Sequence, residues 1–234
     1  MISENLQGIH ARITSAALAA GRDPAGVTLV AVSKGQPAAA LREAYQAGQR
    51  DFGESYVQEW QEKAEQLNDL TDIRWHFLGH LQRNKFKHVL GRVHLLHSLD
   101  DMLGLDEMAR QAWQGKLKQD VLLQVNLADE QSKRGCGAAD AELFVEVLQK
   151  SPGLRLKGLM LLPPYDADVE LVRPWFKQLA QLASDLDKHF GSHPSLPAPG
   201  HWLLSMGMSG DFEVAIAEGA THVRIGTALF GERT

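Results

Sequence analysis

Lys34 is the residue whose type and position best suit covalent chemistry in this chain of 234 residues. It directly follows the apolar, β-branched run TLVAVS at residues 28–33, which predicts a buried strand. A lysine at the end of such a strand is partly desolvated, and desolvation favours the neutral amine. A neutral amine is what an imine-forming lysine needs. A lysine here also suits a plainer role, with its ammonium group reaching out to water.

Two glycine-bearing turns near the C-terminus have the composition of a phosphate site. In the first, Ser205 and Ser209 flank Gly207 ahead of a short helical pattern. In the second, Gly226 and Thr227 directly follow a strand-like run. Free backbone N–H groups at such turns bind anions, so the pair predicts phosphate binding. Ordinary capping of two helices is the alternative for each turn taken alone.

Arg224 lies two residues before Gly226, so strand alternation points both residues to the same side. If that side is the inside of a barrel, the guanidinium requires a partner, because a buried unpaired charge is costly. The partner is a carboxylate of the protein or the ring of a bound cofactor.

The elements that position these residues alternate along the whole chain. Eight strand-like runs are separated by helical patterns, and about 200–250 residues is the usual size of a closed (β/α)8 barrel. We therefore predict one α/β domain, a TIM-type barrel over residues 1–234 with an extra N-terminal helix; an open doubly wound sheet is the alternative. Active sites of such barrels lie at the C-terminal ends of the strands. The predicted strands are 28–33, 51–53, 73–78, 93–98, 121–127, 154–161, 201–205 and 221–225.

Composition narrows the class of protein. The net charge of −5 argues against a chain that coats nucleic acid. No apolar run approaches the roughly 18 residues that cross a membrane. The single cysteine, Cys136, can form no internal disulfide, which favours a cytoplasmic location. The proline-rich segment 191–200 is interpreted as a long loop and not as a domain boundary.

Other candidate sites are weaker. His76 and His80 have the i, i+4 spacing of a metal pair, but they straddle a strand end and no carboxylate follows at ligand spacing, so we predict no metal. Five basic residues between Arg83 and Arg92 are expected on a solvated helix face, with a docking surface as the alternative. Cys136 has no flanking base and is expected to be inert.

These motifs together resemble the pyridoxal phosphate homeostasis proteins, which are similar to the barrel domain of alanine racemase, the third fold type of pyridoxal phosphate enzymes. The resemblance covers nearly the whole chain. It rests on AVSK ending at Lys34, FGESYVQE from Phe52, WHFLGHLQRNK from Trp75, NLADEQSKRG from Asn126, GLMLLPP from Gly158, and the pair LSMGMSGDFEVAIAEG and VRIGTALFG.

The resemblance implies a bound pyridoxal 5'-phosphate, linked as an imine to Lys34, with Arg224 facing the pyridine nitrogen. His76 is expected to line the cofactor pocket or to be satisfied within the core. Two positions depart from the family pattern, which usually has Thr at the position of Gly35 and Asn at that of Ser55. The phosphate contacts are expected from Ser205, Gly207, Ser209, Gly226 and Thr227.

Three functions remain open. The resemblance favours a monomeric protein that buffers pyridoxal phosphate and delivers it to enzymes that require it. The second is a weak amino-acid racemase that uses Lys34 with Tyr56 or Tyr165, the tyrosines after strands two and six. Racemisation needs acid–base groups on both faces of the cofactor, and the racemase domain that supplies the second group is not expected here. The third, an aldolase that forms an imine without cofactor, conflicts with the phosphate turns unless its substrate is phosphorylated.

Overall fold

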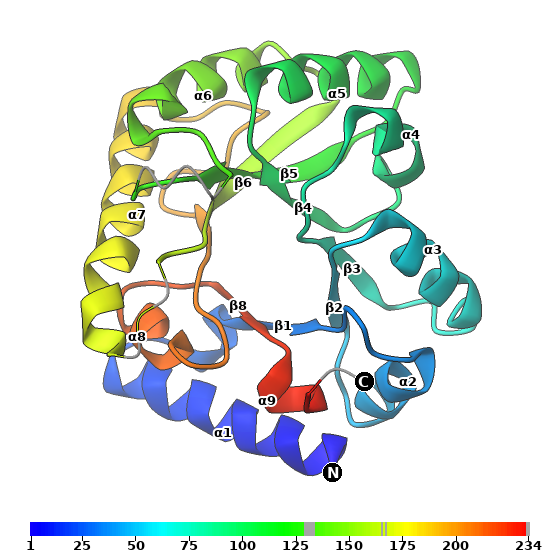
Figure 1. Cartoon of the computed structure of the whole chain (residues 1–234). Helices are drawn as coiled ribbons and strands as arrows, with labels where there is room; N and C mark the ends of the chain where they lie inside the picture. Colours follow the sequence, from blue (N-terminus) through cyan, green and yellow to red (C-terminus); the bar gives the residue numbers. More distant parts are fainter. Residues whose placement is uncertain (129–133, 165, 167, 233–234) are drawn as a thin grey trace.

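Eight parallel strands close into a barrel in the order of the sequence, from β1 to β8 and back to β1 (Figure 1). This computed structural model describes residues 1–128, 134–164, 166 and 168–232. The predicted (β/α)8 barrel is confirmed. The strands are β1 Thr28–Val32, β2 Asp51–Glu54, β3 Arg74–Phe77, β4 Leu95–Leu99, β5 Gln119–Val125, β6 Leu154–Leu161, β7 Leu203–Ser205 and β8 His222–Ile225.

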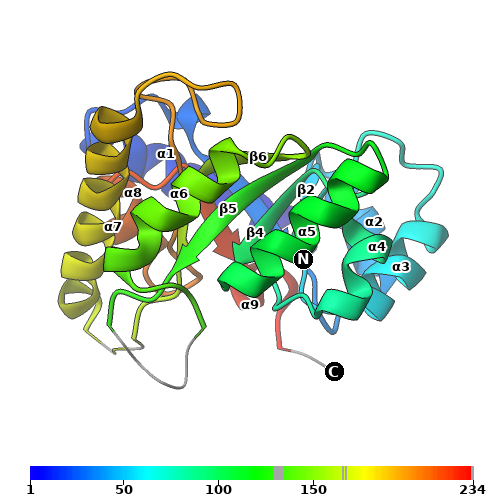
Figure 2. The same cartoon turned by 90° about the horizontal axis from the view of Figure 1, so that it is seen from above.

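The helices surround the strands on the outside of the barrel (Figure 2). They are α1 Ile2–Ala19, α2 Ala38–Gln46, α3 Val57–Gln66, α4 Phe86–Val89, α5 Met102–Gln114, α6 Ala141–Gln149, α7 Val169–Phe190, α8 Phe212–Ala217 and α9 Thr227–Phe230. One expectation is corrected: the basic residues from Arg83 to Arg92 do not share a helix face. That segment is a 3-10 turn, Arg83–Lys85, followed by the single-turn helix α4 and a loop.

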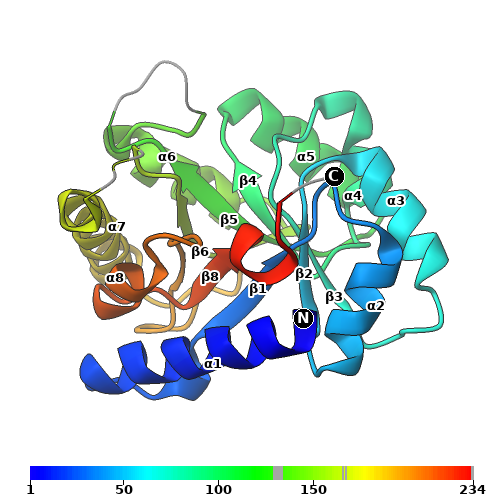
Figure 3. The same cartoon turned by 60° about the horizontal axis from the view of Figure 1, so that its bottom comes forward.

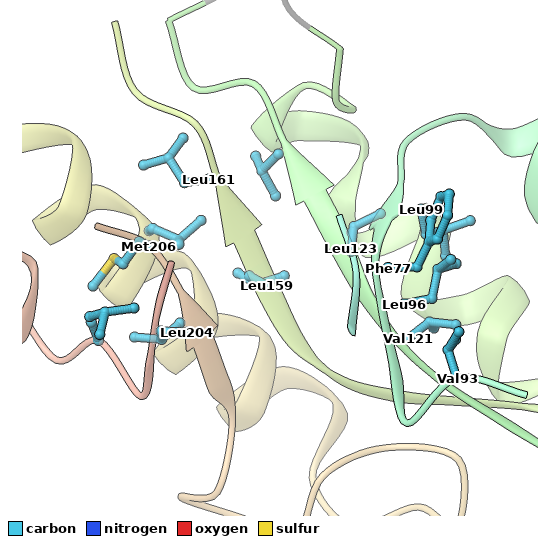
Figure 4. Packing of buried hydrophobic residues seen from close by; sticks show 14 of the residues in the cluster. Phe77, Val93, Leu96, Leu99, Val121, Leu123, Leu159, Leu161, Leu204 and Met206 are labelled. Carbon is cyan, nitrogen blue, oxygen red and sulfur yellow. The ribbon is translucent and has the colours of Figure 1, made fainter. Parts of the chain in front are cut away.

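Alternation along each strand separates two apolar clusters. Leu159 and Leu161 of β6 belong to the main core between strands and helices, part of which Figure 4 shows. Met160, between them, belongs to a smaller cluster with Leu95 and Leu122. Because successive residues of a strand point to opposite faces, the small cluster lies inside the barrel. Polar residues take other inward positions, among them His76 on β3, His97 on β4 and Arg224 on β8.

The extra N-terminal helix α1 packs against α8 and α9 (Figure 3). Its apolar stripe of Leu6, Ile9 and Ile13 is buried. The helix ends in a Schellman motif, in which the N–H of Arg22 donates to the carbonyl of Ala17. The N–H of the preceding residue, Gly21, donates to the carbonyl of Leu18. Gly21 has φ +68°, which glycine adopts without strain. This helix therefore braces the two elements that follow β7 and β8.

The segment 191–200 is a loop that leads from α7 to β7, as expected. It is tied back to the end of α7, because both Gly200 N and Trp202 Nε1 donate to the carboxylate of Asp187, at 2.8 and 3.0 Å. Among the described residues, no helix is long and apolar enough to cross a membrane.

Candidate functional site

A cavity of about 440 Å3 lies at the C-terminal ends of the strands, within the size range of small-molecule sites. It brings together residues that are far apart in the sequence, from the ends of β1, β2, β6, β7 and β8. Of the residues named from the sequence, it is lined by Lys34, Ser55, Ser209, Arg224, Gly226 and Thr227.

Lys34 sits on the turn that ends β1. The carbonyl of Ser33 accepts from Gln36 N at 2.9 Å, which closes the turn around Lys34 and Gly35. Gly35 has φ +73°, a conformation that is strained for any β-branched residue. The glycine found where the family usually has threonine therefore suits this turn, and Lys34 still lines the cavity.

A buried group of charges holds the backbone on both sides of Lys34. The ammonium of Lys63, on α3, donates to Ser33 O at 2.7 Å, to Glu54 Oε1 at 2.6 Å and to Glu59 Oε1 at 2.7 Å. Its three donors are thus all satisfied. Ser33 Oγ also donates to Glu54 Oε1 at 2.7 Å, and Gly35 N donates to Glu59 Oε1 at 2.5 Å. We call Glu54, Glu59 and Lys63 the clamp.

Electrostatics inside the clamp are uneven. Burial raises the pKa of Glu54 above its ordinary value, and the hydrogen bonds from Lys63 and Ser33 oppose that rise. Only Oε1 of this carboxylate is engaged, and within the described part of the chain its buried Oε2 has no partner. The ion pair between Lys63 and Glu54 is therefore buried away from water. Removing one of the two partners is costly, because the other charge is left buried without compensation.

The turns after β7 and β8 expose backbone donors to the cavity. Within the residues that the structure describes, the N–H groups of Ser209, Gly210, Gly226 and Thr227 donate no hydrogen bond, and all four residues line the cavity. The neighbouring N–H of Met208 is already satisfied by Asp211 Oδ1 at 2.5 Å. Four unengaged N–H groups around one space form a site for an anion such as phosphate.

Arg224 points into the barrel from β8 and reaches the cavity. Its side chain is held by two acceptors, Ser205 Oγ at 2.8 Å from Nη1 and Leu161 O at 2.9 Å from Nη2. Burial lowers the pKa of Arg224 to about 10, with a smaller opposing effect from Asp211, so the guanidinium stays charged at neutral pH.

Three residues expected at the site lie elsewhere. Ser205 is fully buried and is not among the residues that line the cavity, and its hydroxyl is hydrogen-bonded to Arg224 and His97. His76 is buried within the barrel against Asp51 and His97, so its core alternative holds and it does not line the cavity. Gly207 shapes the turn from below: its φ is +90°, and a Cβ there would lie 2.6 Å from that of Ala215.

Of the two candidate tyrosines, only Tyr56 lies among the described residues. The side chain of Tyr56 is 65% exposed at the start of α3 and is not among the lining residues. Tyr165 lies outside the described residues, as does part of the motif that begins at Asn126. Among the described residues no cluster of His, Cys, Asp and Glu could hold a metal ion; His76 and His80 bond to different carboxylates, Asp51 and Asp100.

The clamp and two polar residues inside the barrel, Asp51 and His97, were not predicted from the sequence. A signal was present: Asp51, His76 and His97 are polar residues at inward positions of three consecutive strands. Asp51 is level with Arg74 and His76 with Gly53 in the register of the sheet. The clamp left no such pattern, because it joins β2 to a helix.

The lone Cys136 is buried, and burial raises the pKa of its thiol to about 12, so it offers no nucleophile at neutral pH.

Comparison with known proteins defines the class. A profile of the alanine racemase N-terminal domain matches residues 5–234, which agrees with the barrel. A relative from Pseudomonas aeruginosa named pyridoxal phosphate homeostasis protein is 45% identical over 232 residues, 99% of this chain and 96% of the relative. A relative of the same name from Escherichia coli K12 is 39% identical over 234 residues, 99% and 97% of the two chains. The chain belongs to the family of pyridoxal phosphate homeostasis proteins.

Solved structures agree with this membership. PipY of Synechococcus elongatus, determined with PLP bound, has a TM-score of 0.85 and 36% identity, covering 99% of this chain and all of that one. Alanine racemase from Corynebacterium glutamicum shares the fold, with a TM-score of 0.66 and 15% identity over 97% of this chain and 62% of the racemase.

Proposed function

We propose that this chain binds pyridoxal 5'-phosphate (PLP) in the cavity, holds it as an imine on Lys34, and serves cofactor homeostasis without turnover of its own. The names of the relatives and the PLP in PipY support the proposal. The observation that carries it is chemical: Lys34, Arg224 and four unengaged N–H groups line one cavity. These groups match an aldehyde, a ring nitrogen and a phosphate.

Each residue has a distinct task in this proposal. The amine of Lys34 condenses with the aldehyde, which forms one C=N bond and releases one water molecule. The N–H groups of Ser209, Gly210, Gly226 and Thr227 hold the phosphate dianion. Ser55, half-buried at the end of β2, lines the same cavity and offers one hydroxyl.

Arg224 supports a carrier over an enzyme. When bound, PLP supplies an electron sink that stabilises carbanions, and the sink is strongest when the pyridine nitrogen is protonated. A guanidinium that remains charged at neutral pH opposes a proton on that nitrogen. Arg224 therefore favours retention of the cofactor over broad amino-acid chemistry. The exposed position of Tyr56 gives the racemase alternative no support.

The wider role follows from the same site. We propose that the protein works as a monomer. We propose that it buffers the cofactor in the cytoplasm and passes it to apoenzymes. Transfer from the loaded protein to a PLP-requiring apoenzyme, followed by the activity that the apoenzyme regains, tests this part.

The decisive experiment concerns Lys34. The wild-type protein mixed with PLP is expected to absorb as an imine and, after borohydride reduction, to carry a pyridoxyl group on the peptide that contains Lys34. Lys34→Ala removes both signals. Lys85→Ala, which changes an exposed lysine outside the cavity, is the matched control and retains them. A reducible adduct that persists in Lys34→Ala overturns the assignment.

A second assay separates carrier from enzyme. Wild-type protein loaded with PLP is incubated with L- and D-alanine in D2O, and exchange of the α-proton is followed by NMR. The carrier predicts no exchange above that of free PLP. Exchange that is faster in the protein, and lost in Lys34→Ala, favours the racemase-type alternative.

A further inference from the structure

Five polar side chains cross the inside of the barrel in one hydrogen-bonded line that ends at the cavity. Its links are 3.0 Å from Asp51 Oδ1 to His76 Nε2, 2.9 Å from His76 Nδ1 to His97 Nε2, 2.9 Å from His97 Nδ1 to Ser205 Oγ, and 2.8 Å from Ser205 Oγ to Arg224 Nη1. We call Asp51, His76, His97 and Ser205 the relay. It runs from the first residue of β2 through β3 and β4 to β7.

The two ends of the line determine its direction. Arg224 can only donate, so Ser205 Oγ accepts at the cavity end. At the other end, burial alone would raise the pKa of Asp51, but hydrogen bonds from His76 and Arg74 hold it well below its usual value. Asp51 is therefore an ionised carboxylate that only accepts.

With both ends fixed, the donor and the acceptor of each hydrogen bond between them can be assigned in turn. His76 donates to Asp51 through Nε2, and burial lowers its pKa, so the ring is neutral and its Nδ1 is an acceptor. His97 then donates to that atom through Nε2 and accepts at its own Nδ1. Ser205 donates its hydroxyl proton to His97 and accepts from Arg224. Every donor and acceptor in the line is used once with both imidazoles neutral.

The geometry points to the relay as the device that positions Arg224 at the cavity and that links it through aligned hydrogen bonds to the carboxylate of Asp51, on the far side of the barrel. The charge of Asp211 acts on Arg224 separately, without a hydrogen bond to it. Among the described residues no carboxylate forms an ion pair with Arg224 directly. Its two hydrogen-bond acceptors are a neutral hydroxyl and a carbonyl. Aligned hydrogen bonds polarise one another, so the negative charge of Asp51 strengthens Ser205 as an acceptor.

The relay also connects the two ends of the barrel. Arg74, whose side chain is 48% exposed, donates to both carboxylate oxygens of Asp51, at 2.7 and 2.5 Å. The outer end of the line is thus anchored at the surface where the strands begin, and the inner end faces the cavity where they finish. The inference rests on the proposed function in one respect, namely that PLP is the group opposite Arg224.

The first test needs no cofactor. We expect 15N–1H NMR of the ligand-free protein at pH 7 to show His76 and His97 as neutral rings protonated on Nε2. The exposed ring of His189 provides the reference spectrum of a solvated histidine. A proton on Nδ1 of either buried ring at pH 7 reverses or breaks the line and overturns the inference.

The second test is a double-mutant cycle read from the pH midpoint of the PLP imine absorbance. Arg224→Gln defines the shift caused by losing the guanidinium. Ser205→Ala and His97→Phe are expected to shift the midpoint in the same direction and to raise the Kd for PLP about tenfold, as for one lost hydrogen bond to a charged group. In the Arg224→Gln background, neither change shifts the midpoint further.

The matched control is His222→Phe. His222 is also buried, and its ring centre lies 5.9 Å from that of His76, but it bonds to Thr221 outside the line. We expect it to leave the midpoint and the Kd unchanged. A shift from His97→Phe that is matched by His222→Phe, or that adds to that of Arg224→Gln, overturns the relay. Should His97→Phe fold poorly, Ser205→Ala answers the same question. Wild-type protein without an imine spectrum contradicts the proposed function instead, and the NMR result still decides the direction of the line.

Discussion

Lys63 on α3 and Glu54 on β2 form a buried ion pair, 2.6 Å from Nζ to Oε1, directly behind the strand end that carries Lys34. The side chains are 6% and 0% exposed. Because the same ammonium also binds the carbonyl of Ser33, the pair sets the backbone from which Lys34 enters the cavity. The place of Lys34 thus depends on a second lysine, which is not among the residues that line the cavity.

Replacing Lys63 by methionine is expected to lower the free energy of unfolding by about 3 kcal/mol or more, because it leaves a buried carboxylate without its cation. It also lowers the fraction of PLP held as imine, since Ser33 and Glu59 lose their common partner. Chemical denaturation and absorbance measure the two effects. The double variant Lys63→Met/Glu54→Gln is expected to recover most of the stability. Arg42→Gln, which breaks an exposed pair with Asp69, should leave the unfolding midpoint near that of the wild type. If Lys63→Met and Arg42→Gln lowered the free energy of unfolding by the same amount, the prediction would be contradicted.

Stability is expected to fall as the pH drops below about 6.5, the ordinary pKa of histidine. Burial lowers the pKa of His76, His97 and His222, the last to about 3. Below pH 6.5 the unfolded chain therefore binds protons at these histidines more readily than the native protein does, and the free energy of unfolding falls. For His222, the loss between pH 6.5 and about 3 is up to about 1.4 kcal/mol per pH unit. Above pH 6.5 the three histidines are neutral in both the folded and the unfolded chain, so they cause no loss in the free energy of unfolding. Urea denaturation at pH 7, 6 and 5 measures it, and His222→Phe should reduce the slope. An unfolding free energy that stays constant from pH 7 to 5 would contradict the pKa directions.

Gly207→Ala is expected to destabilise the protein by about 3 kcal/mol, from a strained backbone and an overpacked turn. The residue has φ +90°, and an added Cβ would lie 2.6 Å from Ala215 Cβ and 3.0 Å from Phe212 Cα. In the proposed site this turn supplies phosphate donors, so the affinity for PLP is expected to fall too. Gly210→Ala is the control: nothing lies within 4 Å of its Cβ position. Thermal unfolding compares them, and equal melting temperatures would show that the turn tolerates a side chain at both positions.

Tyr56→Phe is expected to change neither the imine spectrum nor the Kd for PLP. The side chain is 65% exposed and lies outside the cavity, so its hydroxyl contacts no bound group. Titration with PLP, monitored by absorbance, compares the variant with the wild type and with Ser55→Ala, which changes a residue that does line the cavity. A loss of affinity in Tyr56→Phe alone would place this tyrosine at the site.

Much of the architecture is readable from local patterns. Eight apolar runs with helical spacing between them predict the barrel, because strand and helix periodicities are local properties and the closed barrel is what eight such units form. Lys34, Arg224 and the glycine turns were also identifiable, since barrel sites gather at the strand ends. The helix predicted for the basic residues from Arg83 to Arg92 was wrong, because the spacing of charges alone does not distinguish a helix from a turn followed by a loop.

What the sequence by itself determined is the fold and the position of Lys34 and of the glycine-bearing turns at the strand ends, because these depend on a residue's type and its place in one strand or turn. The tertiary structure decided which polar side chains meet. Ser205 is the last residue of β7, where a phosphate ligand was expected, yet its burial in the barrel brings it to His97, 108 residues away. The clamp and the relay depend on register between strands and on the packing of α3, and these long-range contacts leave no periodic trace in the chain.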